Sequence, residues 1–369
     1  MAPRAKPIEP PEEIGPAWTD RLIGHAEAEQ AFLKAHESGR MPHAWLISGP
    51  KGVGKATLAY RMARFLLAQP VEEGGMFAAP PPATTLQMSP EARVFRQIAQ
   101  KAHPDFRLLE RAINEKTGKR RSEIVIDDVR EVIDFLHLKP SAGKWRVVIV
   151  DSADDLNRNS ANALLKILEE PSANTVLLLL SHAPQALLPT IRSRCRKLVL
   201  QPLPDEVVSA EIGQRFPKSS AADRQIAAQT AAGSLGQAIR MVEDDGTGLL
   251  RDIGALLAGW PKLDAGLVHK LGDRLAGRDQ GPQFELAVEL LGWWFARMAR
   301  ASATGILPNP EIFQGESALI QRMRDAASLD RWLELWEKVS RLFDRVNSVN
   351  LDRKQAWLAG FLAIEGLGR

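Results

Sequence analysis

The sequence predicts an α/β protein that opens with a doubly wound parallel sheet and ends in a helical region. Within residues 44–68 a glycine-rich turn joins a short apolar run to a helical pattern. Strand and helix patterns then alternate up to about residue 204, and beyond it the apolar residues follow helical spacing. Alternating strands and helices are typical of a parallel sheet that carries helices on both faces.

Length and composition limit the classes of protein to consider. A chain of 369 residues is long enough for two or three domains, and its apolar content of 45% is ordinary for a globular protein. No apolar run is long enough to cross a bilayer, and the start of the chain lacks the apolar segment of a secretory signal. A single cysteine excludes an internal disulfide framework. We therefore expect a cytoplasmic protein.

Residues 44–68, AWLISGPKGVGKATLAYRMARFLLA, predict a buried strand, a phosphate-binding loop and a helix. The glycines allow the backbone to wrap closely around a ligand, while Lys55 and the amides at the helix start supply positive potential. A P-loop normally continues with Ser or Thr, whose hydroxyl holds Mg²⁺, but this chain has Ala56 there and Thr57 comes one position late. The loop therefore predicts phosphate binding without a complete metal site.

An all-apolar run at residues 147–150 predicts a second buried strand, and Asp151 follows at its carboxyl end, where α/β sheets place ligands. The run DSADD resembles a Walker B element, in which the residue after the aspartate is a glutamate that orients the attacking water. Here that residue is Ser152, and a hydroxyl is no base near neutral pH without an activator. Asp154 or Asp155 stays open as a substitute. The predicted nucleotide-binding residues are Gly49, Gly52, Gly54, Lys55, Ala56, Thr57 and Asp151.

The other elements follow from apolar spacing and from breakers. Helices are expected at 28–35, 94–102, 126–136, 160–170 and 187–191, and further strands at 175–180 and 198–200. A mobile excursion is expected at 69–88, which is rich in Pro, Gly and Ala. Residues 106–126 predict a hairpin with the basic tip NEKTGKRR, whose cations either meet phosphates or form a solvated turn.

Four motifs occur together in this chain: the phosphate loop, the degenerate Walker B run, NALLKILEEP at 162–171 and PTIRSRC at 189–195. This combination resembles the clamp-loader branch of the AAA+ ATPases, which serves bacterial DNA polymerase III. The resemblance runs from Leu22 to the end of the chain. It implies three domains: an AAA+ P-loop domain at 21–204, a small helical lid domain at 205–245 and an all-α collar for oligomerisation at 246–369. Residues 1–20 lie before it, and their prolines and mixed charge predict a flexible N-terminal arm.

The same resemblance implies a function in an assembly. The chain would join the other clamp-loader subunits, delta and gamma/tau, in a hetero-pentamer that loads the sliding clamp onto primer–template DNA. Arg194 of the Ser-Arg-Cys motif would act as an arginine finger in trans, reaching the γ-phosphate of ATP held by the neighbouring subunit. The alternative is that Arg194 pairs with a structural carboxylate. Because Ser152 replaces the catalytic glutamate, the chain's own ATP hydrolysis is expected to be weak or absent.

The sequence also suggests a ligand for the loop and two alternative functions. ATP or ADP, with or without Mg²⁺, is the candidate ligand of the loop, and Ala56 predicts weak, metal-independent binding. No zinc is expected, because the four cysteines that form a zinc module in many relatives are missing. The runner-up function is an autonomous AAA+ motor of the gamma/tau type, and a small-molecule P-loop kinase comes third. In the lid, Gln237 replaces the arginine of hydrolysing relatives, and Arg240 follows about one turn later.

Overall fold

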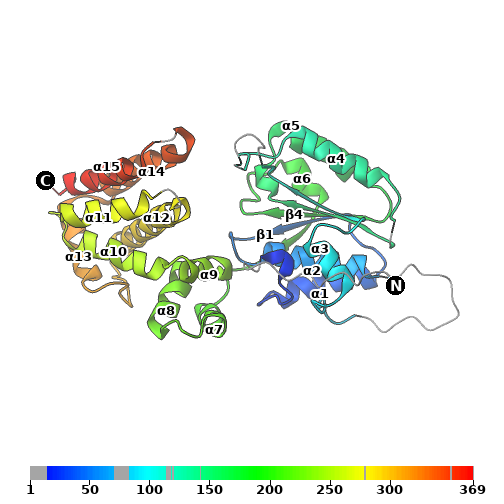
Figure 1. Cartoon of the computed structure of the whole chain (residues 1–369), viewed down its shortest axis with the longest axis horizontal. Coiled ribbons are helices and arrows are strands. Elements are labelled where there is room, and N and C mark those ends of the chain that lie inside the picture. The colour runs from blue at the N-terminus through cyan, green and yellow to red at the C-terminus, as the bar shows by residue number, and fades with distance from the viewer. Residues whose placement is uncertain are drawn as a thin grey trace, which may run out of the picture. The chain divides into compact units, whose positions relative to one another are not determined.

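The computed structural model describes residues 15–69, 83–113, 118, 120–141, 143–277, 280–349 and 351–368, without the side chains of 347–349. The chain divides into two compact units, Met1–Leu203 and Pro204–Arg369. The first combines a sheet with helices and the second is helical (Figure 1). The predicted α/β fold class with a helical C-terminal region is confirmed. Among the described residues, every helix is too short or too polar to cross a membrane.

The first unit is built on a five-stranded sheet in the order β2-β3-β4-β1-β5, and all its strand pairs are parallel. The strands are β1 (Ala44–Ser48), β2 (Phe106–Glu110), β3 (Arg146–Asp151), β4 (Thr175–Ser181) and β5 (Arg196–Val199). Every residue of β1 and β4 is buried. Strands buried on both faces need no alternation of polar and apolar residues, which explains their continuous apolar runs.

Helices cover both faces of this sheet (Figure 1). One face carries α1 (Ala26–Glu37), α2 (Lys55–Leu67) and α3 (Arg93–Ala99); the other carries α4 (Ile126–His137), α5 (Arg158–Glu169) and α6 (Pro189–Arg194). Alternate side chains of β1 enter different cores, since Trp45 and Ile47 pack with α1 and α2 while Leu46 packs with α4 and α5. The sheet is therefore doubly wound, as the sequence predicts.

The predicted hairpin between residues 106 and 126 is wrong in its second half. An isolated antiparallel bridge joins Ile113 to Arg120, but Ile124 forms an isolated parallel bridge with Leu156 instead of returning along β2. Ile124 is fully buried against the α4–α5 face, and its N–H donates to Asp155 O at 2.7 Å. Ile124 is therefore apolar because it packs in the core, not because it belongs to a hairpin strand. Most of the predicted basic tip, and residues 70–82 of the predicted excursion, lie outside the described residues.

Two buried arginines of α2 hold the segment at residues 15–20, which includes the 3-10 turn η1 (Pro16–Trp18). Arg64 donates from Nη1 to Thr19 O at 2.9 Å and from Nη2 to the carbonyl of Ala17. Arg61 donates from Nη1 to the carbonyl of Asp20. This end of the predicted arm is therefore bonded to the helix that follows the phosphate loop, and the rest of the arm lies outside the described residues.

The second unit is helical, and its helices from α8 (Ala221–Thr230) onward contribute to one apolar core. The helices are α7 (Asp205–Arg215), α8 (Ala221–Thr230), α9 (Leu235–Glu243), α10 (Gly246–Ala258), α11 (Ala265–Leu275), α12 (Gly281–Thr304), α13 (Glu316–Ala326), α14 (Leu329–Val349) and α15 (Arg353–Gly366). Trp260, Trp294, Trp332 and Trp357 are buried in that core and act as packing residues. The division of this unit into a lid at 205–245 and a collar at 246–369 stays a prediction.

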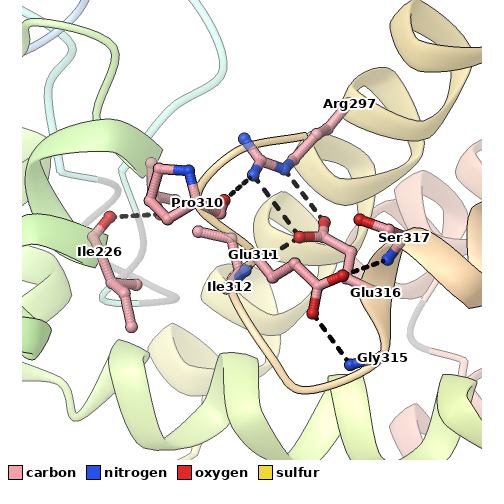
Figure 2. Close-up of polar contacts among 9 residues, drawn as sticks. Ile226, Arg297, Pro310, Glu311, Ile312, Gly315, Glu316 and Ser317 are labelled. Carbon is pink, nitrogen blue, oxygen red and sulfur yellow. Dashed lines mark hydrogen bonds and ion pairs between the residues drawn. The ribbon is translucent and has the colours of Figure 1, made fainter. Parts of the chain in front are cut away.

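A buried ion pair fixes the connection between α12 and α13 (Figure 2). Glu316 is fully buried and receives Arg297 Nε at 3.0 Å and the Ile312 N–H at 2.9 Å. Arg297 also donates to Pro310 O at 2.6 Å. Glu316 is the first residue of α13, where the positive end of the helix dipole favours a carboxylate. The charge is thus buried with partners on both sides, as a buried carboxylate requires.

Candidate functional site

The phosphate loop, residues 49–54, connects the carboxyl end of β1 to α2. Gly49 has φ 151°, and a Cβ atom there would lie 2.5 Å from Leu200 O, so only glycine fits this backbone position. Gly54, with φ 115°, caps α2, and Gly52 also has a positive φ. The first amides of a helix have no acceptor within it. The loop therefore places main-chain donors at the positive end of α2, which suits a phosphate.

Neighbouring segments hold the loop in place. The N–H of Gly49 donates to Ser181 O at 3.3 Å, which joins the loop to β4. His25 Nε2 lies 3.0 Å from Val53 O and joins the other end of the loop to the start of α1. Burial lowers the pKa of His25, so the ring is neutral at pH 7 and donates from Nε2 to this carbonyl. The loop is thus supported at both ends.

Lys55 is buried beneath the loop, and its ammonium donates to Gly49 O and Pro50 O, each at 2.7 Å. Burial lowers the pKa of Lys55 to about 8, while the carboxylates of Asp151 and Asp154 act in the opposite direction. The ammonium is therefore still largely charged at pH 7. A phosphate oxygen that replaced one of the loop carbonyls would remove part of the desolvation penalty, because it carries a full negative charge.

The donor set fits a phosphate but not the magnesium site of a P-loop. Ala56 offers a methyl group where a hydroxyl ligand would stand, and Thr57 lies one helix position further on. Asp151 is the last residue of β3. Burial is the main cause that raises its pKa, and the negative charge of Glu110 on β2 raises it further. Among the described residues no group of three or more His, Cys, Asp or Glu is arranged to hold a metal ion. The structure brings these predicted site residues to one edge of the sheet.

Behind Asp151 the chain forms a closed hydrogen-bond network around Asp154, in the short 3-10 turn η2 (Ala153–Asp155). Its Oδ2 accepts from Ser152 Oγ at 2.7 Å and from the His182 N–H at 2.6 Å. Its Oδ1 accepts from Ser181 Oγ at 2.8 Å. Burial alone would raise the pKa of Asp154, but these hydrogen bonds outweigh it and lower the pKa. The carboxylate therefore joins the ends of β3 and β4.

This network bears on the two candidates for a substitute base. Asp154 has both oxygens occupied by donors of the chain, and Asp155 pairs through Oδ2 with Arg111 Nε at 3.1 Å. Asp154 is therefore the less suitable of the two to orient a water molecule, and Asp155 stays open as a substitute. Sequence reasoning missed the role of Asp154. The Ser-x-Asp spacing could have indicated a local cap, but the partners of Asp154 at the end of β4 and just beyond it lie 27 and 28 residues away in the chain.

Arg194 is the last residue of α6, on the face of the sheet opposite α2 (Figure 1). Its Nη1 donates to Thr190 O at 3.1 Å, and its Nη2 lies 2.9 Å from Glu169 Oε1. The side chains of Arg194 and Glu169 are 36% and 49% exposed. A carboxylate partner therefore exists in the isolated chain, as the alternative interpretation had it. An exposed pair of this kind is typically worth about 0.2–1 kcal/mol, so Arg194 can exchange partners.

Arg240 of α9, in the segment predicted to form a lid, is engaged within the second unit. It lies 3.3 Å from Glu289 of α12 and 3.4 Å from Asp244, and it donates to Pro282 O. These contacts join α9 to α12 and occupy the guanidinium. Arg240 lines a cavity of about 170 Å³ between these helices, together with Gln237 and apolar side chains. Arg240, which follows Gln237 by about one turn, therefore contacts residues of its own unit.

A phosphate loop at the carboxyl end of a strand inside a parallel sheet, with helices on both faces and a helical second unit, defines a P-loop protein of the AAA+ class. Residues 24–204 match the family described as "DNA polymerase III, delta subunit". This match lies almost entirely within the first unit, Met1–Leu203.

Similar proteins include several subunits of that polymerase. The chain is 40% identical over 169 residues to DNA polymerase III subunit delta' of Pseudomonas aeruginosa, covering 46% of each chain. It is 31% identical over 217 residues to subunit delta' of Escherichia coli, covering 58% of this chain and 59% of the relative. It is 29% identical over 226 residues to subunit tau of Salmonella typhimurium, covering 60% and 32%. The chain thus spans about half the length of the delta' relatives it matches.

Solved structures give a more distant likeness. A DNA polymerase III gamma subunit-related protein from Thermotoga maritima covers 92% of this chain and 100% of its own, at 19% identity and a TM-score of 0.40.

Proposed function

We propose that this chain is a delta'-type subunit of the DNA polymerase III clamp loader. In this proposal it joins delta and gamma/tau subunits in a hetero-pentamer that loads the sliding clamp onto primer–template DNA during chromosomal replication, in the cytoplasm. It donates Arg194 to ATP bound by a neighbouring subunit and hydrolyses little or no ATP itself. The family match over residues 24–204 and the delta' relatives support the assignment to this complex.

The observation that carries the low hydrolysis is the network around Asp154. Hydrolysis of a bound triphosphate requires a group that positions the attacking water. Ser152 stands where that glutamate would be, and its hydroxyl donates to Asp154 instead. Asp154 also accepts from Ser181, the last residue of β4, and from the N–H of His182, which follows it. Ala56 additionally removes a hydroxyl that would hold the metal. The proposed role is therefore that of a phosphate-binding subunit without a water-activating residue.

Arg194 supplies the complementary half of the proposal. A guanidinium presented to a γ-phosphate in trans stabilises transition-state charge and is typically worth about 10³–10⁵ in rate. Arg194 is exposed at the end of α6, and the weak pair with Glu169 leaves its other N–H groups available. Weak ATP or ADP binding in the chain's own loop, independent of Mg²⁺, is the corresponding proposal for the cofactor.

The first test is ATP turnover by the purified chain alone. The proposal expects a rate indistinguishable from the protein-free background, with and without primer–template DNA. A rate near that of working AAA+ motors would overturn it and favour the second candidate, an autonomous motor of the gamma/tau type. That candidate is motivated by the intact glycines and Lys55 of the loop and by the gamma and tau relatives.

The second test uses the assembled complex. Arg194→Ala should lower ATP hydrolysis by the motor subunits, stimulated by clamp and DNA, by about 10²-fold or more at the shared site. Lys197→Ala removes another exposed cation three residues away and serves as the matched control. Assembly of the variant pentamer is verified by gel filtration. An unchanged rate for Arg194→Ala in an intact complex would exclude the finger role.

A further inference from the structure

The last residues of α5 and α6 meet on the surface of the first unit. Glu169 ends α5 and Arg194 ends α6, and Arg194 Nη2 lies 2.9 Å from Glu169 Oε1. The carbonyl of Thr190, one turn before Arg194, accepts from Nη1 at 3.1 Å. The guanidinium is thus held from two sides, by its own helix and by the neighbouring one.

Glu169 is poorly placed for the stability of its own helix. The carboxyl end of a helix carries partial negative charge, so a carboxylate there is unfavourable and a cation is favoured. Glu169 has another carboxylate beside it, Glu170, at the same helix end. Its contact with Arg194 crosses to the next helix. The helix dipole thus disfavours Glu169, and the ion pair that the structure shows for its carboxylate is the one with Arg194.

The contact leaves the guanidinium able to bind a phosphate. An arginine side chain has five N–H donors in a planar fork. Thr190 O takes one from Nη1 and Glu169 takes one from Nη2, so three remain. A long exposed side chain loses rotamer freedom when it is fixed in an active site. A side chain already held by two acceptors has lost part of that freedom before it meets the ligand.

We propose that Glu169 is a positioning residue for Arg194, which it holds in the orientation that reaches the phosphate on the neighbouring subunit. The inference rests on the proposed finger role of Arg194. Glu169 itself touches neither nucleotide nor metal. It acts through one ion pair, so its effect is limited to the strength of an exposed pair and is far smaller than that of Arg194.

The test compares five variants of this chain, four single and one double, in the reconstituted complex with unaltered partner subunits. Glu169→Ala should lower the stimulated kcat for ATP by about two- to fivefold, the range that an exposed ion pair supplies, without changing KM. Glu169→Gln keeps an acceptor oxygen for Nη2 and should retain most of the rate. Glu170→Ala removes the neighbouring exposed carboxylate and should have no effect. In the Arg194→Ala background, Glu169→Ala should add no further loss.

Three other outcomes would contradict the positioning role of Glu169. If Glu169→Ala behaves like Glu170→Ala, or lowers the rate equally with and without Arg194, the positioning role is wrong. A faster rate for Glu169→Ala would likewise overturn it, since Glu169 would then compete with the phosphate for Arg194. Thermal unfolding and gel filtration of each variant exclude misfolding or failed assembly. If Arg194→Ala itself leaves the rate unchanged, the proposed function fails first, and that result is distinct from the others.

Discussion

Two regions at the carboxyl ends of the strands differ in whether the main chain or side chains form the site. The phosphate cradle, residues 49–55, follows β1 and is shaped by the main chain, with glycines at positive φ and Lys55 bonded to loop carbonyls. The carboxylate edge, residues 151–155, follows β3 and depends on side chains. In the proposed function, the backbone cradle still binds phosphate with Ala56 in place, whereas Ser152 leaves the carboxylate edge without the water-activating glutamate. The proposal therefore separates phosphate binding from phosphate cleavage in this fold.

The largest effect is expected from a change that breaks the cradle itself. Gly49→Ala places a Cβ atom 2.5 Å from Leu200 O at a φ that alanine rarely adopts. We expect the free energy of unfolding to fall by about 2–4 kcal/mol and nucleotide binding to be lost. Gly39→Ala, also at positive φ but in open space, is the control and should lower the free energy of unfolding by about 1 kcal/mol. Urea unfolding and nucleotide titration measure both; wild-type binding by Gly49→Ala would contradict the geometry.

A smaller effect on nucleotide affinity is expected from deprotonating Lys55 in the cradle. Because the pKa of Lys55 is lowered to about 8, its ammonium is mostly charged at pH 7 and mostly neutral at pH 9. The affinity for ADP should therefore fall by about tenfold as pH rises from 7 to 9, since the charged fraction falls by that factor. Lys55→Arg keeps its charge over this range and should give a nearly flat profile. A flat profile for the wild type would show that Lys55 does not control binding.

A few-fold effect should follow from restoring the missing hydroxyl. In the wild type, Mg²⁺ should change the affinity for ATP by less than about twofold, because Ala56 offers the metal no ligand. Ala56→Ser should make Mg²⁺ tighten ATP binding by about three- to tenfold, a gain on the scale of one charge-assisted contact. Calorimetric titrations with Mg²⁺ and with a chelator compare the two chains. Strong Mg²⁺ dependence in the wild type would mean that another group replaces the hydroxyl.

The smallest effect is expected at the carboxylate edge. Ser152→Glu restores the residue type of a Walker B element but leaves Asp154 bonded to Ser181 and His182. ATP turnover by the isolated variant should stay within about threefold of the wild-type background, because the cradle still lacks its metal ligand and a rate gain needs both groups. A colorimetric phosphate assay is sufficient. An increase of tenfold or more would show that a single carboxylate was all that the edge lacked.

The parts of the site that the sequence predicts are those with local signals. The glycine spacing before Lys55 and the apolar run before Asp151 define the cradle and the strand end without reference to the rest of the chain. The bonds from Asp154 to β4, and the pair between Glu169 and Arg194, join residues far apart in sequence. Nothing in the residue types indicates which carboxylate meets which donor. These contacts depend on the order of strands in the sheet, which alternation alone does not determine.

The error in the hairpin has a related cause. An apolar run near a turn favours a strand in the absence of tertiary information, and Ile124 with its neighbours forms such a run. In the fold, Ile124 is drawn into the α4–α5 core and its main chain pairs with the segment after β3. Burial against helices thus overrides the local preference. The helices and central strands were predictable because their apolar periodicity serves the same core that the sheet creates.

The arginines beneath residues 15–20 limit how this chain can be shortened. Arg64 is 1% exposed, and burial lowers its pKa to about 10, so it remains a cation at neutral pH, and its guanidinium donates hydrogen bonds to main-chain carbonyls upstream of Leu22. A recombinant version that begins at Leu22 would keep the complete P-loop motif yet strip those acceptors from a desolvated guanidinium. Expression boundaries for crystallography or for deletion mapping therefore belong before Gly15.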